Sequence, residues 1–216
     1  MTICLVTDRR RLAPGASVDL ACERVVAQAR AAVHAAVDLI QVRERDLEAR
    51  DLAGLVAAVK AIAQGTPTRV VVNDRLDVAL ACGADGVHLR ADSIAVDAVR
   101  RIAPKGFLVG RSVHGVADMP GAAGADYLIA GTVFPSASKA QGHATIGDDG
   151  LRAIAAASPV PVLAIGGVDE NRLGDVAAAG AAGIAAIGLF ASLDSSSMKN
   201  LVDRMRLRFD RLHNAP

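Results

Sequence analysis

The chain has 216 residues, of which 52% are hydrophobic and 2% aromatic, and its 24 Lys and Arg nearly balance its 23 Asp and Glu. This length is typical of one domain with a large core of small aliphatic side chains. A net charge of +1 and few aromatic rings argue against a nucleic-acid surface, which needs a basic excess or stacking rings. No stretch offers the roughly 20 apolar residues of a membrane span. We therefore expect neither nucleic acid nor a membrane as a partner.

Cysteine usage and the first residues bear on the compartment. The chain has three cysteines, Cys4, Cys22 and Cys82, without C-x-x-C spacing. An odd set without a pattern is typical of reduced thiols. In a secretory signal, basic residues precede a long apolar stretch, whereas MTICLVTDRRRL has the reverse order. A cytoplasmic protein is expected.

Short apolar runs alternate with longer amphipathic ones along the chain. The predicted strands are Ile3–Thr7, Asp38–Arg43, Arg69–Asn73, Asp85–Leu89, Phe107–Val113, Asp126–Ala130, Val160–Ile165 and Gly183–Ile187. The predicted helices are Val18–Ala36, Leu47–Gln64, Asp74–Ala81, Ile94–Ile102, Val116–Ala123, Asp148–Ala157, Glu170–Ala179 and Ser196–Leu212. Strands that are apolar on both faces are typical of parallel strands covered on two sides. About eight strand–helix units with no change in winding predict an α/β fold, a single (β/α)₈ TIM barrel over residues 1–216.

A weak internal repeat supports this alternation. The segments CGADGVHL (82–89), AGADYLIA (123–130) and AGAAGIAA (179–186) each end a helix, turn at a glycine and begin an apolar strand. One long polar loop is predicted over 134–147, and loops of this length are often lids over a site.

In a barrel the active site lies at the C-terminal ends of the strands, so polar residues there are the candidates. After the second strand, alternation places Gln41, Arg43 and Arg45 on one side, which we expect to face inward. Two guanidinium groups so spaced can hold a diphosphate. The competing interpretation is an ion-pair network with Glu44 and Asp46 at the rim.

The third and fourth strands are followed by carboxylates. Asp74, after Asn73, is suited either to Mg²⁺ or to capping the next helix. Asp92 or Ser93 is expected to cap the helix that follows. His88 is expected to be a hydrogen-bonded core group.

The remaining strand ends point to an anion. Ser112 can donate to a phosphate, and His114 is either a proton carrier or a surface histidine. Gly166 and Gly167 after the seventh strand, with Gly188 after the eighth, are typical of the phosphate cup of barrels, in which bare amides and a helix N-terminus face the anion. The alternative is a simple turn.

Taken in order, the motifs resemble those of the thiamine phosphate synthase / TenI family over most of the chain. The segments that carry the resemblance are LVTD, QVRERDL, VNDRLDVALACGADGVHL, GRSVH, GADYLIAGTVFPSASK and PVLAIGG. The resemblance implies a (β/α)₈ barrel, a role in thiamine biosynthesis and a thiazole phosphate ligand.

The family includes two chemistries. The synthase joins hydroxymethylpyrimidine diphosphate to thiazole phosphate with Mg²⁺ and releases diphosphate, through a pyrimidine carbocation that the thiazole nitrogen traps. The TenI-like tautomerase aromatises a carboxythiazole phosphate without a metal. We favour the synthase, with the tautomerase and a non-catalytic binding protein for a thiamine precursor as alternatives.

Resemblance to the synthase also implies roles for individual residues. Gln41 would hold the pyrimidine, and Asp74 would bind Mg²⁺. The diphosphate would be held by Arg43, Asn73, Ser112 and Lys139. The thiazole phosphate would lie near Ser136 and Ser138, which replace the usual Thr, and in the cup of Gly166, Gly167 and Gly188.

The chain also departs from the synthase pattern. In QVRER, Arg45 replaces the Lys of the usual QLREK. The usual HLGQxD becomes HLRADS, so Ser93 replaces the second metal ligand and Asp92 lies one residue early. Gly188 replaces a Ser. The segments RER and GRSVH also resemble TenI-like members. Thr132 replaces the His of those members, so a tautomerase would need His114 or another group to move the proton. The oligomeric state stays open, with a homodimer as one candidate.

Overall fold

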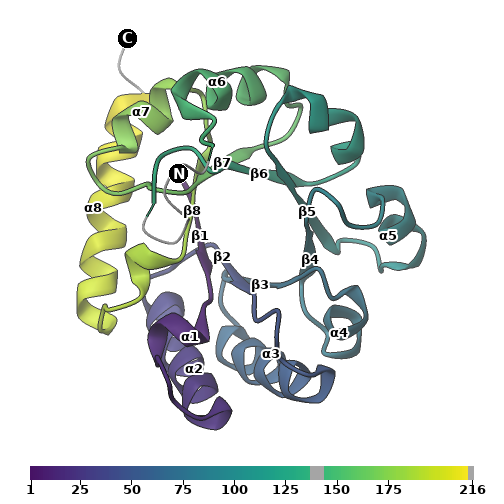
Figure 1. Ribbon diagram of the computed structural model, residues 1–216. Helices are drawn as coiled ribbons and strands as arrows, with labels where there is room; N and C mark the ends of the chain where they lie inside the picture. Colours follow the sequence, from purple (N-terminus) through teal and green to yellow (C-terminus); the bar gives the residue numbers. More distant parts are fainter. Residues whose placement is uncertain (137–143, 214–216) are drawn as a thin grey trace.

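The computed structural model describes residues 1–136 and 144–213 and shows eight parallel strands in a closed barrel (Figure 1). Each strand pairs with the next along the chain, and β8 pairs with β1 to complete the ring. The strands are β1 Thr2–Val6, β2 Leu39–Val42, β3 Arg69–Asn73, β4 Gly86–Leu89, β5 Leu108–Val113, β6 Tyr127–Gly131, β7 Val162–Ile165 and β8 Gly183–Ala186. The predicted strands and the (β/α)₈ barrel are confirmed.

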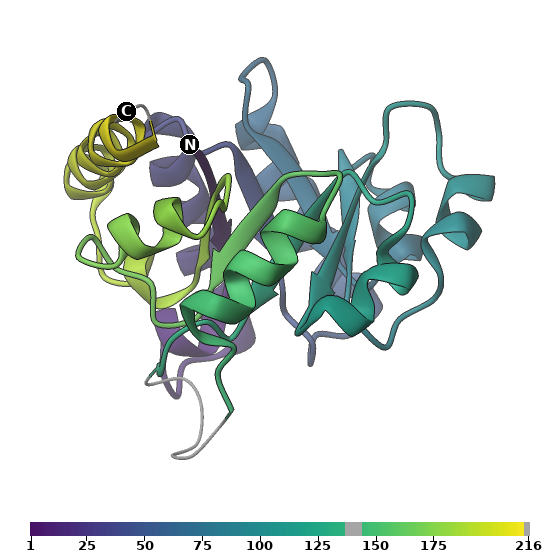
Figure 2. The same cartoon turned by 90° about the horizontal axis from the view of Figure 1, so that it is seen from above.

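Helical segments connect the strands and cover the outside of the barrel (Figure 2). They are α1 Arg9–Leu12, α2 Val18–His34, α3 Ala49–Ala63, α4 Leu76–Ala81, α5 Val96–Ile102, η1 Val116–Ala122, α6 Gly147–Ala157, α7 Leu173–Ala178, η2 Gly188–Phe190 and α8 Ser195–His213. The α-helix predicted over 116–123 is wrong in type, because η1 is a 3₁₀ helix that contains Pro120 and proline cannot donate the backbone hydrogen bond of an α-helix interior. In the part of the chain that the structure describes, no helix is both long and apolar enough to cross a bilayer.

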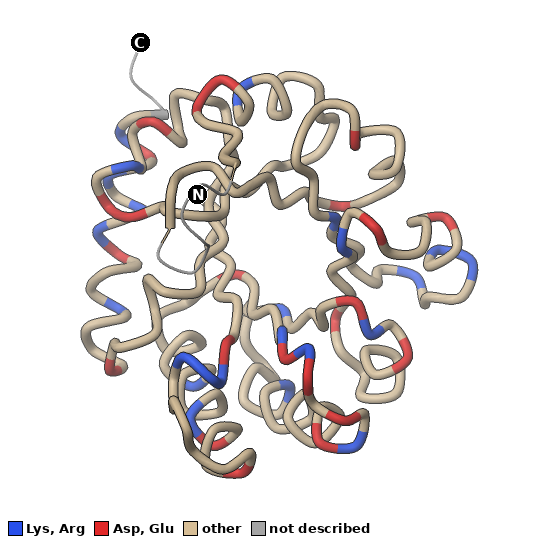
Figure 3. Tube along the Cα trace, viewed as in Figure 1, with Lys and Arg blue, Asp and Glu red and all other residues tan. Residues whose placement is uncertain are grey.

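Strand side chains alternate between the barrel interior and the layer beneath the helices. Cys4 and Val6 of β1 belong to a small interior cluster, whose other buried members are Leu39, Tyr127, Ile129, Leu163 and Ala185. Since Leu39 faces inward, the period of two along β2 turns Gln41 and Arg43 toward the interior as well. Most Lys, Arg, Asp and Glu lie on the helices and loops, and the ring of strands is largely uncharged (Figure 3).

Candidate active site

A cavity of about 180 Å³ opens at the C-terminal end of the barrel, lined by residues from or directly after all eight strands. Parallel strands bring these ends together at one face, so residues far apart in the sequence meet there. Eight of the predicted site residues line it: Gln41, Arg43, Arg45, Asn73, Ser112, His114, Ser136 and Gly166. The position of the site therefore follows from the order of the strands.

A second cavity, of about 450 Å³, adjoins the first and shares Ser136 and Gly166 with it. Its wall contains the three glycines predicted to form the phosphate cup. Gly167 has φ +64°, and a Cβ on it would lie 2.4 Å from the Pro135 carbonyl oxygen, so only glycine fits. Among the described residues, the N–H groups of Gly167 and Val168 have no hydrogen-bond partner, which leaves two donors for an anion.

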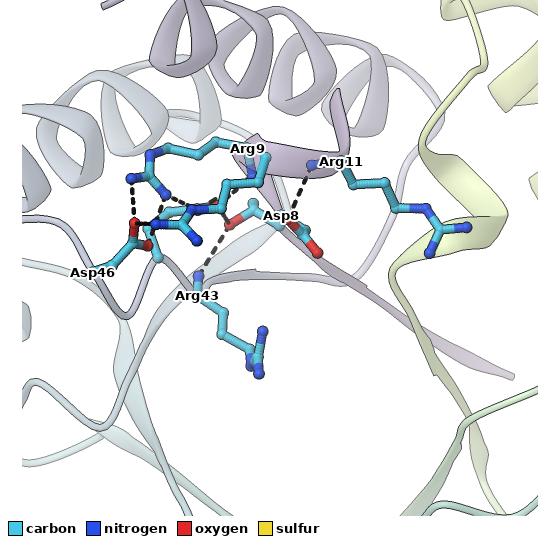
Figure 4. A network of polar contacts seen from close by, with 8 residues as sticks. Asp8, Arg9, Arg11, Arg43 and Asp46 are labelled. Atoms are coloured by element: carbon cyan, nitrogen blue, oxygen red, sulfur yellow. Dashed lines mark hydrogen bonds and ion pairs between the residues drawn. The ribbon is translucent and has the colours of Figure 1, made fainter. Parts of the chain in front are cut away.

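Arg11 lines this second cavity although the sequence did not single it out. It lies on α1 and extends toward the segment after β8 (Figure 4). A Cβ on Gly188 would lie 2.9 Å from Arg11 Nη2 and 3.0 Å from its Cζ, so the guanidinium occupies the space that a side chain at position 188 would need. The run Arg9–Arg11, one residue after the first predicted strand, was the available signal, but such runs are usually solvated surface.

Gln41 supplies an unpaired donor to the first cavity. The residue is 3% exposed, and its Nε2 is buried without a hydrogen-bond partner among the described residues. A buried donor left unpaired costs about 1–3 kcal/mol. An acceptor atom of a ligand in this cavity would satisfy it.

The carboxylates after β2 pair with Arg9 rather than with the two predicted arginines. The Arg9 guanidinium donates to Asp46 Oδ1 at 2.7 Å and to Oδ2 at 2.6 Å, and its Nη1 lies 3.5 Å from Glu44 Oε2. These bonds with Arg9 hold the pKa of Asp46 well below its usual range. The alternative network of Arg43 and Arg45 with these carboxylates is not formed, so both guanidiniums remain available to a ligand.

Arg43 is anchored by its backbone and projects its side chain into the cavity. Its N–H donates to Thr7 Oγ1 at 3.0 Å, while its side chain points away from the Asp46 network (Figure 4). Burial, and then the positive charge of Arg45, lower the pKa of the Arg43 guanidinium. No described residue forms a hydrogen bond or ion pair with the side chains of Arg43 or Arg45. Two neighbouring cations that form no direct ion pair with a described residue favour an anionic ligand.

His88 is the buried, hydrogen-bonded group that the sequence predicts. Its Nε2 lies 2.9 Å from Ser112 Oγ, and its Nδ1 lies 3.3 Å from the Tyr127 hydroxyl. Burial, and then the charge of Arg111, lower the pKa of His88 from 6.5 to about 3, so the ring is neutral at physiological pH. When Tyr127 donates to Nδ1, Nε2–H donates to Ser112, and the serine hydroxyl is free to donate into the cavity.

His114 lies at the rim of the same cavity, with an exposed side chain. Its Nδ1 is hydrogen-bonded to the Gly131 carbonyl oxygen, and its backbone N–H donates to Asp118 Oδ2 at 2.6 Å. Since a carbonyl only accepts, the proton of the neutral ring lies on Nδ1. Nε2 is then free to accept a proton.

The predicted metal ligands do not form a site suited to Mg²⁺. The Asp74 carboxylate, from a residue with φ +64°, accepts a hydrogen bond from the Ser93 hydroxyl and lies 3.7 Å from Arg90 Nη1. Arg90 Nη2 donates to Asp92, whose side chain is 70% exposed. Mg²⁺ needs converging oxygen ligands, whereas a guanidinium lies between these two carboxylates.

Neither proposed cap is formed. α4 begins at Leu76 without a side-chain cap, so Asp74 does not cap it. α5 begins at Val96 after Ala95, again without a side-chain cap, so Asp92 and Ser93 do not cap that helix. Ser138 and Lys139, together with most of the predicted lid, lie outside the described residues.

Comparison with known proteins shows to which family the chain belongs. The profile of a family described as thiamine monophosphate synthase matches residues 4–190. A thiamine-phosphate synthase of Methanoregula boonei is 44% identical over 161 residues, 74% of each chain. One from Clostridium botulinum is 36% identical over 197 residues, 90% of this chain and 91% of that one. A thiamine phosphate pyrophosphorylase from Pyrococcus furiosus superposes with a TM-score of 0.80 at 29% identity, covering 98% of this chain and 96% of the other.

Proposed function

Because the chain belongs to the thiamine monophosphate synthase family, we propose that it couples hydroxymethylpyrimidine diphosphate with thiazole phosphate and releases diphosphate. The observation that carries this is the joined pair of cavities. Among the described residues, one cavity holds a buried amide and two guanidiniums without hydrogen-bond partners, and the other has the free N–H groups of Gly167 and Val168 and a further arginine. Together they suit a nitrogen heterocycle with a diphosphate beside a second, phosphorylated ring.

The two arginines at the first cavity serve bond cleavage. In the reaction the pyrimidine C–O bond breaks, its electron pair leaves with the diphosphate, and the thiazole nitrogen donates its lone pair to the carbon. Arg43 and Arg45 stabilise the charge that accumulates on the leaving oxygen. Asn73 and the Ser112 hydroxyl line the same cavity and donate to the phosphoryl oxygens.

The remaining residues orient the two rings. Gln41 Nε2 donates to a ring nitrogen of the pyrimidine, which satisfies the buried amide. The thiazole phosphate binds the N–H groups of Gly167 and Val168, with the Arg11 guanidinium over Gly188. Ser136 lies between the cavities, where the two rings meet.

Incubation of the purified protein with both substrates, with product separated by chromatography, tests this proposal. Thiamine phosphate and diphosphate should appear in equal amounts. The same assay on Arg43→Ala should show a loss of about 100-fold or more in kcat/KM, because a charge-assisted contact made in the transition state is removed. The absence of product, while a known synthase forms it from the same substrates, would refute the proposal.

A second candidate, the metal-independent tautomerase, is favoured by the geometry of His114. Its Nδ1–H is held by Gly131, and its Nε2 is free to accept a proton at the cavity. This activity would convert the carboxythiazole phosphate tautomer in the presence of EDTA, and His114→Asn would abolish it. Binding of thiazole phosphate without turnover in either assay would indicate the binding protein instead.

The setting of the reaction is part of the same proposal. The three cysteines are free thiols, which is typical of the reducing cytoplasm, and we place the reaction there. The substrates are small phosphorylated molecules, as the names of the relatives indicate. A homodimer stays a prediction that size-exclusion chromatography with light scattering can test.

A further inference from the structure

Arg90 connects the two predicted metal ligands with the diphosphate end of the cavity. It follows β4 and lines the same cavity as Arg43 and Arg45. Its Nη1 lies 3.7 Å from Asp74 Oδ2, and its Nη2 donates to Asp92. Its N–H donates to Ser93 Oγ at 3.0 Å, and the Ser93 hydroxyl donates to Asp74 in turn. The Arg90 side chain is thus held by two carboxylates, and its backbone N–H is held by Ser93.

Two substitutions, at positions 90 and 93, change the charge beside Asp74 by as much as a divalent cation would. In the family pattern HLGQxD, a glycine stands at position 90 and a carboxylate at position 93. In that pattern, the charges of the two carboxylates and of one divalent cation sum to zero. Here Ser93 is neutral, and the charges of Asp74 and Arg90 sum to zero, while Asp92, which also accepts from Arg90, has a side chain 70% exposed to solvent. The two substitutions together therefore supply the charge that a divalent cation would bring.

We propose that this chain binds diphosphate without a divalent cation, and that the Arg90 guanidinium, held between Asp74 and Asp92, takes the place of the metal. The identity of the substrate rests on the proposed function, whereas the binding of the diphosphate group does not. A guanidinium has five N–H donors, so Arg90 can contact its carboxylates and still donate to phosphoryl oxygens. Its planar fork matches the spacing of those oxygens.

The neighbouring arginines support this assignment. Arg43, Arg45 and Arg90 line one cavity, and the charge of Arg90 is among those that, after burial and Arg45, lower the pKa of Arg43. Their mutual repulsion is relieved when a polyanion binds between them. A diphosphate carries enough negative charge to do so without a bound metal.

Calorimetric titration of the protein with inorganic pyrophosphate, in EDTA and in Mg²⁺, tests the proposal. The dissociation constant should agree within about threefold between the two conditions. Arg90→Ala should weaken binding in EDTA by about tenfold or more, as expected for loss of a charge-assisted contact. The control Arg101→Ala removes an exposed arginine of α5 that pairs with Asp97 and should change nothing. Binding only with Mg²⁺, or no binding in either condition, would overturn the proposal.

A double variant reverses the exchange. Arg90→Gly with Ser93→Asp restores the family's pattern, so pyrophosphate binding should become dependent on Mg²⁺. Mn²⁺ should then bind to the double variant, detected by electron paramagnetic resonance, and not to the wild type. Thermal melting checks that both proteins are folded. Mn²⁺ bound equally by both proteins would contradict the exchange.

The outcomes separate this inference from the proposed function. Coupling that proceeds only with Mg²⁺ would retain the function and refute the role of Arg90. Binding of pyrophosphate in EDTA without any coupling would retain the role of Arg90 and refute the synthase.

Discussion

Arg11 shows how a single residue contributes to a site through its neighbour. Its guanidinium is placed over the glycine cup because position 188 carries no side chain. Arg11→Ala should raise KM for thiazole phosphate about tenfold with little change in kcat, because the contact is made equally in the ground and transition states. Steady-state kinetics with the thiazole phosphate varied measures this.

The adjacent Arg10 is the matched control for Arg11. It lies on the same short helix, 75% exposed, and pairs with Asp46. Arg10→Ala should leave KM unchanged, because exposed ion pairs contribute little. Equal effects of the two variants would mean that general surface charge, and not the cup, attracts the phosphate.

His88 makes stability dependent on pH. Its pKa is lowered from 6.5 to about 3 by burial, so between these values the unfolded chain binds a proton that the folded chain does not. Stability therefore falls as pH falls below 6.5, by about 1.4 kcal/mol per pH unit. The wild type should lose about 2 kcal/mol more than His88→Gln between pH 8 and pH 5. Urea unfolding at both pH values measures the difference, and parallel losses would contradict it.

At the scale of elements, aspartates directly before strands link neighbouring strands of the barrel two by two through hydrogen bonds. Each of Asp38, Asp85 and Asp126 precedes an even-numbered strand and accepts a hydrogen bond from the N–H of a residue in the preceding odd strand, namely Ile3, Val70 and Val109. The Gly-Ala-Asp of the internal repeat is therefore a strand-pairing device. In the third copy Ala182 stands at this position, so β7 and β8 lack this bond.

Asp85 provides the test of this device. Burial alone would raise its pKa, but the hydrogen bonds from Lys60, Val70 and Arg69 together lower it. A lowered carboxyl pKa stabilises the fold above the unfolded value near 3.8, and this contribution is lost as pH falls through the folded pKa. Asp85→Asn should cost about 1–2 kcal/mol at pH 7 and less below pH 4, measured by urea unfolding. Asp97→Asn, in an exposed pair on α5, should change stability by less than about 0.5 kcal/mol.

Element order was predictable because buried parallel strands are short apolar runs, and the converging strand ends then indicated Gln41, Arg43 and Ser112 as neighbours. The partners of these side chains were not predictable. Asp74 has φ +64°, a left-handed conformation that the sequence pattern does not predict. In this conformation its carboxylate accepts a hydrogen bond from Ser93 and lies 3.7 Å from Arg90 Nη1. Side-chain direction beyond a strand depends on such loop dihedrals, whereas position along a strand depends only on the period of two.

The whole molecule depends on the contact that closes the ring. Gly183 of β8 pairs with Thr2 of β1, and a Cβ on Gly183 would lie 1.9 Å from the Thr2 carbonyl oxygen. Gly183→Ala must push these strands apart, at a cost of about 3 kcal/mol, or about 6–12 °C in Tm. Apart from its chain neighbours and the backbone of α3, no described atom lies within 4 Å of a Cβ added to Gly54, so Gly54→Ala should raise stability by about 0.5–1 kcal/mol. Calorimetric melting distinguishes the two: a Gly183→Ala protein as stable as the wild type would show that β1 and β8 need no such close approach.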